Sequence, residues 1–279
     1  MMSSYFKNIL LVLKYGDEKA LELSQQIKSF LNIRGIKVEI FFNRLEGKTI
    51  EVNSKNIDLV IVVGGDGTLL SVARKMILPE VPFLGFNFGR VGFMAELEAD
   101  SWQESLENIL QGNFRLSNRL ELNYDIPSLE EKGVAVNDIV LHRTGLARLL
   151  EFEITINKEE KFTVRADGVI AATPTGSSAY NFSAGGPLLF PELKAFVLTF
   201  ICPFLCPLPS FVLPKSTKLQ IVLTSFQSEA MLTIDGQKGI LLPPQVKLNI
   251  SVCKKSFILI QKKESGFVTR LKNKGILQC

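Results

Sequence analysis

The residues best suited to chemistry in this sequence are Asp66 and the glycines around it, in the segment GGDGT at residues 64–68. The three glycines have no Cβ and can adopt positive φ angles, so their N–H groups can close around a phosphate. A helix that we expect over residues 68–73 would add N–H donors from its first turn. The predicted phosphate-binding loop consists of Gly64, Gly65, Gly67 and Thr68.

The carboxylate of Asp66 would repel a phosphate, so its place in this loop needs a specific role. It fits a base that takes a proton from a nucleophile, a ligand of a divalent cation, or a side chain that points away from the loop. On these five residues alone, an ordinary strand-to-helix turn in which Asp66 caps the helix is an equal alternative. The segment is no Walker A loop, because no Gly-Lys-Ser/Thr follows, and it lacks the third glycine of the dinucleotide fingerprint.

A second polar stretch, RADGVIAATPTGSSAYNFSAGGP, covers residues 165–187. Small and hydroxyl-bearing residues crowd around Arg165, Asp167 and Tyr180, and no charge follows Asp167. Such a segment brings backbone close to a ligand, while its hydroxyl groups and Asp167 accept hydrogen bonds from sugar hydroxyls and amides. The pattern favours a ligand-binding loop over the alternative of a surface loop rich in glycine and serine.

The first part of the chain predicts an α/β domain with a Rossmann-like open sheet. Leu59–Val63 is apolar at every position, which is typical of a parallel strand covered by helices on both faces. The helical pattern of Asp17–Arg34 lies between expected strands at Ile9–Leu13 and Ile36–Phe42, which predicts a βαβ opening. A further apolar strand, Val81–Phe86, leads into another glycine-rich turn.

Beyond residue 114 the hydrophobic period changes to two, which predicts an all-β, sandwich-like domain. One strand is expected over Val134–Leu141, and Asn157–Glu160 is typical of a hairpin turn. We expect domains at residues 1–115 and 116–252, followed by a tail at 253–279.

The composition indicates a globular protein of 279 residues with a formal net charge of +4. The basic residues are scattered, which suits anionic small molecules and does not indicate a nucleic-acid partner. Prolines interrupt the uncharged segment Ala195–Pro214, so no membrane span or membrane partner is expected. The four cysteines lack metal-ligand spacing and predict free, mostly buried thiols of a reducing, cytoplasmic compartment, and His142 alone builds no metal cluster.

The two polar stretches together resemble the NAD kinase family. GGDGT alone is similar to the loop shared by NAD kinases, diacylglycerol-type lipid kinases and 6-phosphofructokinases. The segment from Asp167 to Pro187 resembles the DG-x-x-x-x-TPTGS-x-AY-x-x-SAGGP element of NAD kinases, which the lipid kinases lack in this form. Gly85–Phe93, Asn137-Asp138 and Asp235-Gly236-Gln237 also match family elements in order and spacing.

The resemblance implies a Rossmann-like α/β domain and a β-sandwich domain with NAD between them, in homodimers or homotetramers whose subunits complete each other's sites. It also places the end of the chain against the first domain, Asp66 in the catalytic loop and Phe93 beside the adenine. Asp66 and Asp235 are candidate catalytic residues because two carboxylates could converge from opposite domains on one ribose, where one accepts the proton and the other holds the cation or orients the base. Asp66 is the candidate metal ligand. Asn137 and Asp138 fall where the family holds the adenosine part of NAD. The other implied NAD-binding residues are Asp66, Gly67, Arg148, Arg165, Asp167, Thr175, Ser178, Ala179, Tyr180, Asn181, Phe182, Ser183 and Gln237.

Three departures from the family pattern affect this assignment. Asp138 replaces a glutamate and is one methylene shorter, whereas Ser178 replaces a threonine and keeps its hydroxyl. Phe204 and Pro209 stand where the family generally has histidine and arginine, so we expect the loop between them to be structural here.

The implied reaction transfers a phosphoryl group from ATP, another nucleoside triphosphate or polyphosphate to the 2′-hydroxyl of the adenosine ribose of NAD, giving NADP. It requires a divalent cation, magnesium or manganese, because the charge of the donor must be neutralised. Two alternatives remain at this point. They are a diacylglycerol-type lipid kinase and a non-catalytic NAD(H)-binding regulator, and Asp66 argues against the second.

Overall fold

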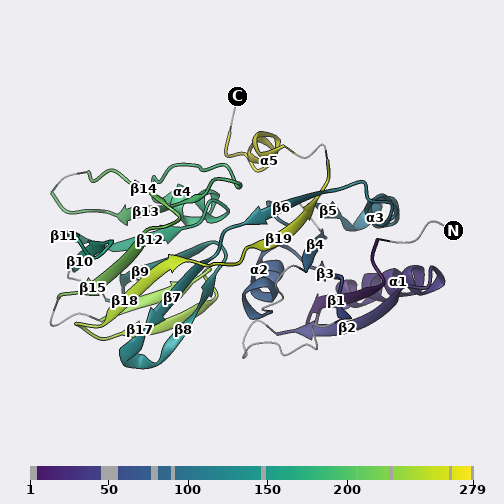
Figure 1. Cartoon of the computed structure of the whole chain (residues 1–279), viewed down its shortest axis with the longest axis horizontal. Helices are drawn as coiled ribbons and strands as arrows, with labels where there is room; N and C mark the ends of the chain where they lie inside the picture. Colours follow the sequence, from purple (N-terminus) through teal and green to yellow (C-terminus); the bar gives the residue numbers. More distant parts are fainter. Residues whose placement is uncertain are drawn as a thin grey trace. The chain divides into compact units, whose positions relative to one another are not determined.

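The computed structural model of the chain describes residues 5–44, 56–76, 81–88, 92–145, 149–205, 207–225, 229–263 and 266–277. These residues form two units, one made of residues 1–118 and 257–279 and the other of residues 119–256 (Figure 1). The first unit is α/β and the second is built from antiparallel sheets, as the sequence predicts.

Sheet A forms the centre of the first unit, with strand order β2-β1-β3-β4-β19-β6 and β5 paired to β4. The pairs among β1, β2, β3 and β4 are parallel, and so is the pair of β19 with β4. The end of the chain therefore returns to the first unit, which confirms the expected tail. The strands are β1 (Asn8–Lys14), β2 (Lys37–Asn43), β3 (Leu59–Val63), β4 (Pro82–Asn87), β5 (Leu97–Glu98), β6 (Arg115–Arg119) and β19 (Phe257–Gln261).

Side-chain contacts fix two of the helices of this unit. Helix α1 (Glu18–Ile33) is capped by Asp17, whose carboxylate accepts the N–H of Ala20 at 3.0 Å. Helix α2 (Asp66–Lys75) follows β3, and α3 (Trp102–Leu110) follows a 3-10 turn at Ala99–Ser101. Helix α5 (Phe267–Asn273) is tied to the unit by a buried ion pair at 2.5 Å between Arg270 and Glu96.

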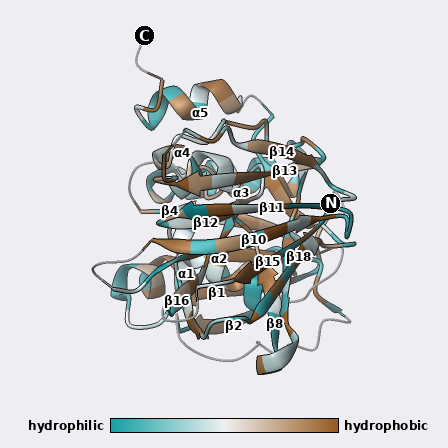
Figure 2. Cartoon of the chain, turned by 90° about the vertical axis from the view of Figure 1, so that its left-hand side faces the viewer, coloured by the Kyte–Doolittle hydropathy of each residue, from teal (hydrophilic) through white to brown (hydrophobic). Residues whose placement is uncertain are grey.

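The second unit is a sandwich of two six-stranded sheets that share one hydrophobic core. Sheet B has the order β11-β10-β15-β18-β7-β8, and sheet C has the order β14-β13-β12-β9-β16-β17. Apolar residues dominate β13 and β14, which Figure 2 shows mainly in brown. The strands are β7 (Leu122–Ile126), β8 (Glu131–Ala135), β9 (Asp138–Arg143), β10 (Leu150–Ile156), β11 (Glu160–Ala166), β12 (Gly168–Ala172), β13 (Ala195–Ile201), β14 (Phe211–Pro214), β15 (Lys218–Leu223), β16 (Ala230–Ile234), β17 (Lys238–Leu242) and β18 (Lys247–Val252).

Three short helical turns complete this unit: Pro127–Leu129, Gly176–Ser178 and α4 (Tyr180–Ser183). The core-facing residues of both sheets are almost fully buried, for example Phe152 in sheet B and Phe196 in sheet C. The other face of sheet C buries a small cluster of Val140, Ile170 and Ala172, with Ala184 packed against it.

Two expectations need correction. The single strand expected over Val134–Leu141 is two strands, because the backbone N–H groups of residues 136–138 bond the side chain of Asp235 instead. Cys202 and Cys253 are free thiols, but Cys202 is exposed, and Cys206 and Cys279 lie outside the described residues. No helix in the described part of the chain is long and apolar enough to cross a membrane.

Candidate functional site

The glycine loop connects the carboxyl end of β3 to the first turn of α2. The helix begins at Asp66, two residues before the predicted start, with Gly65 in extended geometry as its N-cap. An acidic residue in a first turn interacts favourably with the helix dipole. Gly64 has φ +156°, and a Cβ there would lie 2.7 Å from the Thr68 hydroxyl oxygen, so only glycine fits this turn.

The loop presents only part of its predicted phosphate-binding surface. Gly67 is exposed and Gly65 is half-buried, whereas Gly64 and Thr68 are buried against each other. A phosphate can therefore reach the backbone around Gly65 and Gly67, at the positive end of the helix dipole. Asn87, at the end of β4, lies close by: its Oδ1 would be 3.6 Å from a Cβ on Gly65. The sequence analysis did not single out Asn87.

The carboxylate of Asp66 is held by three consecutive backbone N–H groups. Phe93 and Ala95 donate to it at 2.7 and 2.9 Å, and Met94 donates at 3.2 Å. Because an ionised carboxylate has about four lone-pair sites, one remains for a bound hydroxyl or cation. A Cβ on Gly92 would lie 2.0 Å from Asp66 Oδ1, so glycine is required for this close approach. Asp66 is thus a fixed acceptor and not a free surface charge.

In the second unit, several predicted residues gather at one end of sheet C. Asp138 begins β9, and the neighbouring strands β12 and β16 place Ala172 and Ile234 beside Asp138 and Ile139. The segment 173–183 and the turn 235–237 leave the sheet at this same end. The geometry explains why stretches far apart in the sequence share one region.

Asp235 holds this region together in the same manner as Asp66 holds its loop. Its carboxylate accepts the N–H groups of Val136, Asn137 and Asp138 at 3.2, 2.7 and 3.2 Å. Asp235 and Gly236 both have positive φ, at 51° and 62°, which forms the tight turn after β16. Three successive N–H groups that converge on an anion form a nest, and here the anion is a side chain of the protein.

Burial changes the acidity of two carboxyl groups near Asp235. The pKa of Asp138 rises to about 7, first because the group is buried and second because the charge of Asp235 is close. The same two causes raise the pKa of Glu121 to about 7. Burial of a charged group without a cationic partner favours its neutral form. The sequence analysis missed Glu121, because a single glutamate before a strand carries no local signal.

The raised pKa of Asp138 predicts a pH-dependent stability. Its unfolded value is near 3.8 and its folded value near 7, so between these the folded state keeps a proton that the unfolded state loses. Stability therefore falls as pH rises through this window. In the wild-type protein, the free energy of unfolding falls between pH 5 and pH 8. We expect this fall to be about 2–3 kcal/mol smaller in Asp138→Asn.

Urea unfolding of both proteins at the two pH values measures this difference. Asp125→Asn, which changes an exposed carboxylate of the same unit, is the matched control and should retain the wild-type pH dependence. Equal pH dependence in Asp138→Asn and wild type would contradict the buried titration.

The segment after β12 combines one unpaired hydroxyl with internally satisfied neighbours. Thr175 is 7% exposed, and its Oγ1 has no hydrogen-bond partner among the described residues. Gly176 lies against the Asn137 carbonyl, where a Cβ would come within 2.1 Å. Thr173 Oγ1 donates to the Val136 carbonyl at 2.6 Å. A buried hydroxyl without a partner is costly, which marks Thr175 as a position for a bound ligand.

The predicted run from residue 178 to residue 183 divides into buried and exposed members. Asn181 is fully buried and bonds Ser177, Pro187 and Thr199 at 3.1, 3.1 and 2.7 Å, so its amide supports the loop from behind. Tyr180, Phe182 and Ser183 are exposed, and Ser178 and Ala179 are half-buried.

Two predicted ligand residues, Arg165 and Asp167, lie away from Asp138. Arg165 is in β11 of sheet B, and Asp167 directly precedes β12 of sheet C. Gly168, the first residue of β12, pairs with His142 near the end of β9, and Asp167 bonds Arg143 at 3.2 Å. The length of β12 separates this end from Asp138 by roughly 13 Å. The predicted residues of this unit therefore form two groups and not one.

Phe204 supports the second group. Its N–H donates to the Arg165 carbonyl at 2.8 Å, and the Arg165 guanidinium lies 5.1 Å from the centre of the Phe204 ring. An aromatic ring at this distance attracts the cation and limits its motion. Arg148 lies outside the described residues, and Gln237 lies in the turn after β16, where its N–H bonds the Ile234 carbonyl.

Comparison with known proteins identifies matches to both parts of the chain. The family described as ATP-NAD kinase N-terminal domain matches residues 37–114, and ATP-NAD kinase C-terminal domain matches residues 136–262. The protein named NAD kinase from Nitratidesulfovibrio vulgaris (strain DSM 19637 / Miyazaki F) is 35% identical, with 99% of each chain covered. NAD kinase of Lawsonia intracellularis is 31% identical, over 97% of this chain and 96% of its own.

Two solved structures share the fold. Yeast NADH kinase complexed with NADH has a TM-score of 0.82 and 22% identity, covering 97% of this chain and 87% of its own. An NAD kinase from Archaeoglobus fulgidus in complex with ATP has a TM-score of 0.77 and 23% identity, covering 95% of this chain and 99% of its own. These similarities confirm the expected architecture of an α/β part followed by a β-sandwich part.

Proposed function

This chain belongs to the NAD kinase family, and from that membership we infer its reaction and propose roles for its residues. It is a kinase that phosphorylates NAD. We assign the terminal phosphoryl group of ATP as the group transferred and the 2′-hydroxyl of the adenosine ribose as its acceptor, so that NADP is the product. The observation that carries the residue assignment is the fixed carboxylate of Asp66 in the glycine loop.

Asp66 is proposed as the group that accepts the proton of the attacking hydroxyl. A secondary alcohol is a weak acid, so its attack on phosphorus needs a positioned base. The three N–H donors on Asp66 fix its orientation before substrate arrives, and its one remaining lone-pair site suits a single hydroxyl. Phosphate oxygens of the donor would bind the backbone around Gly65 and Gly67.

A divalent cation, magnesium or manganese, is proposed to accompany ATP. It would neutralise the phosphates and align the leaving group. In the described part of the chain, no three His, Cys, Asp or Glu side chains are arranged to hold a metal ion. Magnesium usually binds through one or two carboxylates plus substrate phosphates. Asp66 would supply such a ligand only in place of the hydroxyl, because one lone-pair site remains on it.

The NAD-binding role is proposed for the end of sheet C that carries Asn137, Asp138 and Thr175. Asp235 accepts the backbone N–H groups of the half-buried Asn137 and the buried Asp138, so it is proposed to position these two residues and not to take part in proton transfer. Phe93, half-buried beside the Asp66 contact, is proposed to contact the adenine.

Thr175→Val tests the unpaired hydroxyl. Valine keeps the shape and removes a buried polar atom that has no partner, so the melting temperature should stay equal or rise. We expect the KM for NAD to rise about tenfold with kcat nearly unchanged, because a hydrogen bond to a non-reacting part of a substrate contributes uniform binding. Steady-state kinetics and thermal unfolding of the same preparations provide both values. An unchanged KM would remove Thr175 from the site.

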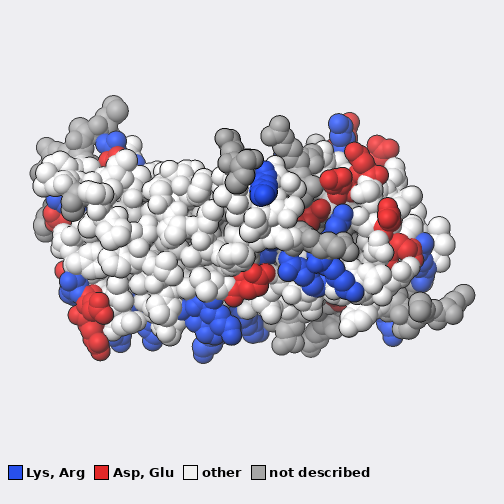
Figure 3. Space-filling model, turned by 90° about the horizontal axis from the view of Figure 1, so that it is seen from above, with Lys and Arg blue, Asp and Glu red and all other residues white. Residues whose placement is uncertain are grey.

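Homo-oligomers, dimers or tetramers, are proposed because Arg165, in β11 of sheet B, and Asp167, just before β12, lie away from the end of β12 that pairs with Asp138. These residues would then serve the site of a neighbouring subunit. Apolar side chains are exposed beside them, and Figure 3 shows few charged side chains over α4, β13 and β14. A large exposed apolar surface is typical of a subunit contact. In the segments 180–193 and 204–212, the exposed apolar residues are Tyr180, Phe182, Phe190, Leu193, Phe204, Leu205, Phe211 and Val212.

The cytoplasm is proposed as the location, where NAD and ATP are available and thiols such as Cys202 stay reduced. The diacylglycerol-type lipid kinase alternative does not agree with family matches to both parts of the chain.

One assay tests the function and its alternatives together. Purified protein is incubated with NAD, magnesium and ATP or polyphosphate, and the product is read with an NADP-specific dehydrogenase. Parallel reactions offer NADH or diacylglycerol as the acceptor. NADP formation with NAD supports the proposal. ATP consumption only with diacylglycerol, or NAD binding without any product, would favour the lipid kinase or the regulator.

A further inference from the structure

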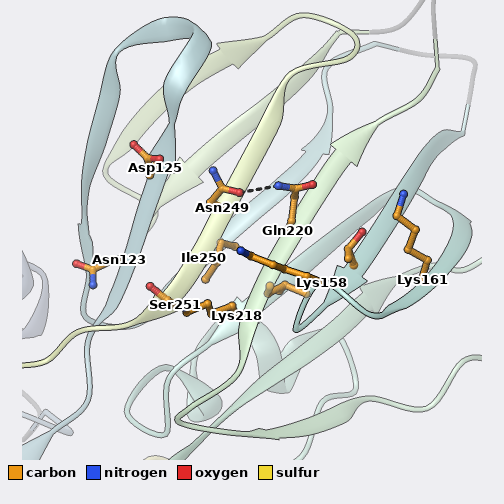
Figure 4. Close-up of a pocket in the computed structure, with 11 residues that line it drawn as sticks. Asn123, Asp125, Lys158, Lys161, Lys218, Gln220, Asn249, Ile250 and Ser251 are labelled. Carbon is orange, nitrogen blue, oxygen red and sulfur yellow. Dashed lines mark hydrogen bonds between the residues drawn. The ribbon is translucent and has the colours of Figure 1, made fainter.

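A pocket on the outer face of sheet B is separate from the residues assigned above. It has a volume of about 510 Å³ and is lined by strands β7, β10, β15 and β18 and by the β10–β11 turn (Figure 4). Pockets of 300–1,000 Å³ are typical of small-molecule sites. In Figure 4 Lys158 and Lys161 lie on the β11 side and Asn123 and Asp125 on the β7 side.

A row of polar residues crosses the sheet at this pocket. The strand registers pair Thr155 with Gln220, Gln220 with Asn249, and Asn249 with Asp125. Gln220 Nε2 donates to Asn249 Oδ1 at 2.9 Å, which fixes both amides and leaves Gln220 Oε1 as an acceptor and Asn249 Nδ2 as a donor. A fixed line of donors and acceptors is suited to a molecule with several hydroxyl groups.

Thr155 provides a second observation that points to a ligand. It lines the pocket, is only 7% exposed, and its Oγ1 has no partner among the described residues. A buried hydroxyl without a hydrogen-bond partner costs about 1–3 kcal/mol of stability. A ligand that bonds this hydroxyl would offset that cost. The row therefore contains a group that the protein itself does not satisfy.

Lysines gather at the β10–β11 end of the pocket. Lys158, Lys161 and Lys218 line it. Within the described ranges of the chain, only Lys161 of these three has an ion pair, to Glu153 at 2.8 Å. Asn157 and Lys158 both have positive φ, at 52° and 68°, in the turn that the Glu159 N–H closes on the Ile156 carbonyl. Glycine usually occupies the second of these positions, and a lysine there is strained. The lysine at this strained position provides a cation beside the pocket.

We propose that this pocket binds a small phosphorylated molecule, a sugar phosphate or ribonucleotide. The phosphate would lie at Lys158 and Lys218, and the hydroxyl groups would lie along Thr155, Gln220, Asn249 and Asp125. Lysine suits a phosphate as a point charge, and carboxylate and amide groups suit ribose hydroxyls. The pocket shares no residue with the proposed NAD and ATP sites, so its ligand does not compete with NAD.

Ribose 5-phosphate is the probe, and isothermal titration of the full chain is the measurement. The expected result is saturable binding that excess NAD does not displace and that ribose or inorganic phosphate alone reproduces at least tenfold more weakly. Adenosine monophosphate serves as the ribonucleotide arm and is titrated with NAD and ATP in excess, so that the proposed substrate sites are already occupied. Absence of saturable binding by either probe, or displacement by NAD, would overturn the proposal.

Lys158→Gly separates binding from folding. It removes the cation and the strained φ, so the melting temperature should rise by about 2–4 °C while affinity falls at least tenfold. Thr155→Val should also weaken binding without loss of folding. The matched control is Lys247→Ala, on the same face of β18 but outside the pocket, which should bind like wild type.

The NAD kinase activity of these three variants should remain at the wild-type value, which separates this pocket from the proposed catalytic function. Unchanged affinity in Lys158→Gly and Thr155→Val would overturn the site. A change in oligomer mass in these variants without probe binding by wild type would assign the face to a subunit contact instead.

Discussion

Asp66→Asn is expected to lower turnover by about 10²–10⁴-fold while NAD still binds, because general-base catalysis contributes about that factor. Asparagine keeps the shape of the side chain and loses the charge and one acceptor. The carboxylate is held by Phe93, Met94 and Ala95, so the substitution also weakens that contact. Turnover and NAD affinity are therefore measured on the same preparation, by initial rates and by calorimetry.

Gly92→Ala is the companion that separates chemistry from positioning. Its Cβ would meet Asp66 Oδ1 at 2.0 Å, so it displaces the contact but retains the carboxylate. If Asp66 acts as the base, Asp66→Asn loses turnover beyond the loss in Gly92→Ala. Equal losses in both variants would reduce Asp66 to a positioning group, and near-wild-type turnover in Asp66→Asn would remove it from catalysis.

Mixing two inactive variants is expected to restore activity if subunits complete each other's sites. Asp66→Asn lacks one part of the site and Asp167→Ala the other, and a mixed dimer contains one site with neither change. Random exchange makes half of the dimers mixed, and half of their sites intact, so activity recovers to about a quarter of wild type. Each variant alone should stay below about a hundredth.

Subunit exchange is confirmed by native mass spectrometry before activity is read. The control mixes Asp66→Asn with Thr175→Val. Each of these changes removes a group from the subunit's own site, so subunit exchange creates no intact site. The activity of this mixture is then that of its Thr175→Val subunits alone. Exchange without recovery in the first mixture would place Arg165 and Asp167 outside the partner's site.

The sequence predicts those elements whose signals are local. Leu59–Val63 is a strand because it is apolar throughout, and the helical pattern of Asp17–Arg34 and the turn at Asn157 follow from chemistry within a few residues. The helix after the glycine loop starts earlier than predicted, because Gly65 and not a later residue provides its extended N-cap. Such boundaries depend on backbone geometry that residue types do not determine.

The features that sequence reasoning could not provide depend on contacts between distant residues. Asp235 bonds the backbone of Asn137, 98 positions earlier, which splits an expected strand in two. The acidity of Asp138 depends on burial and on Asp235. The separation of Asp167 from Asp138 depends on the directions of strands β12 and β9. The sequence motifs assign both residues to NAD binding and carry no information about this separation.

The central claim is the transfer of the ATP γ-phosphoryl group to the ribose 2′-hydroxyl of NAD. Phosphorus-31 NMR of the reaction of purified protein with NAD, ATP and magnesium tests it directly. The account predicts one new 2′-phosphomonoester signal that grows in step with ADP and grows at least about a hundredfold more slowly with Asp66→Asn. ADP formation without a phosphomonoester on NAD, or a phosphate on another hydroxyl, would contradict it.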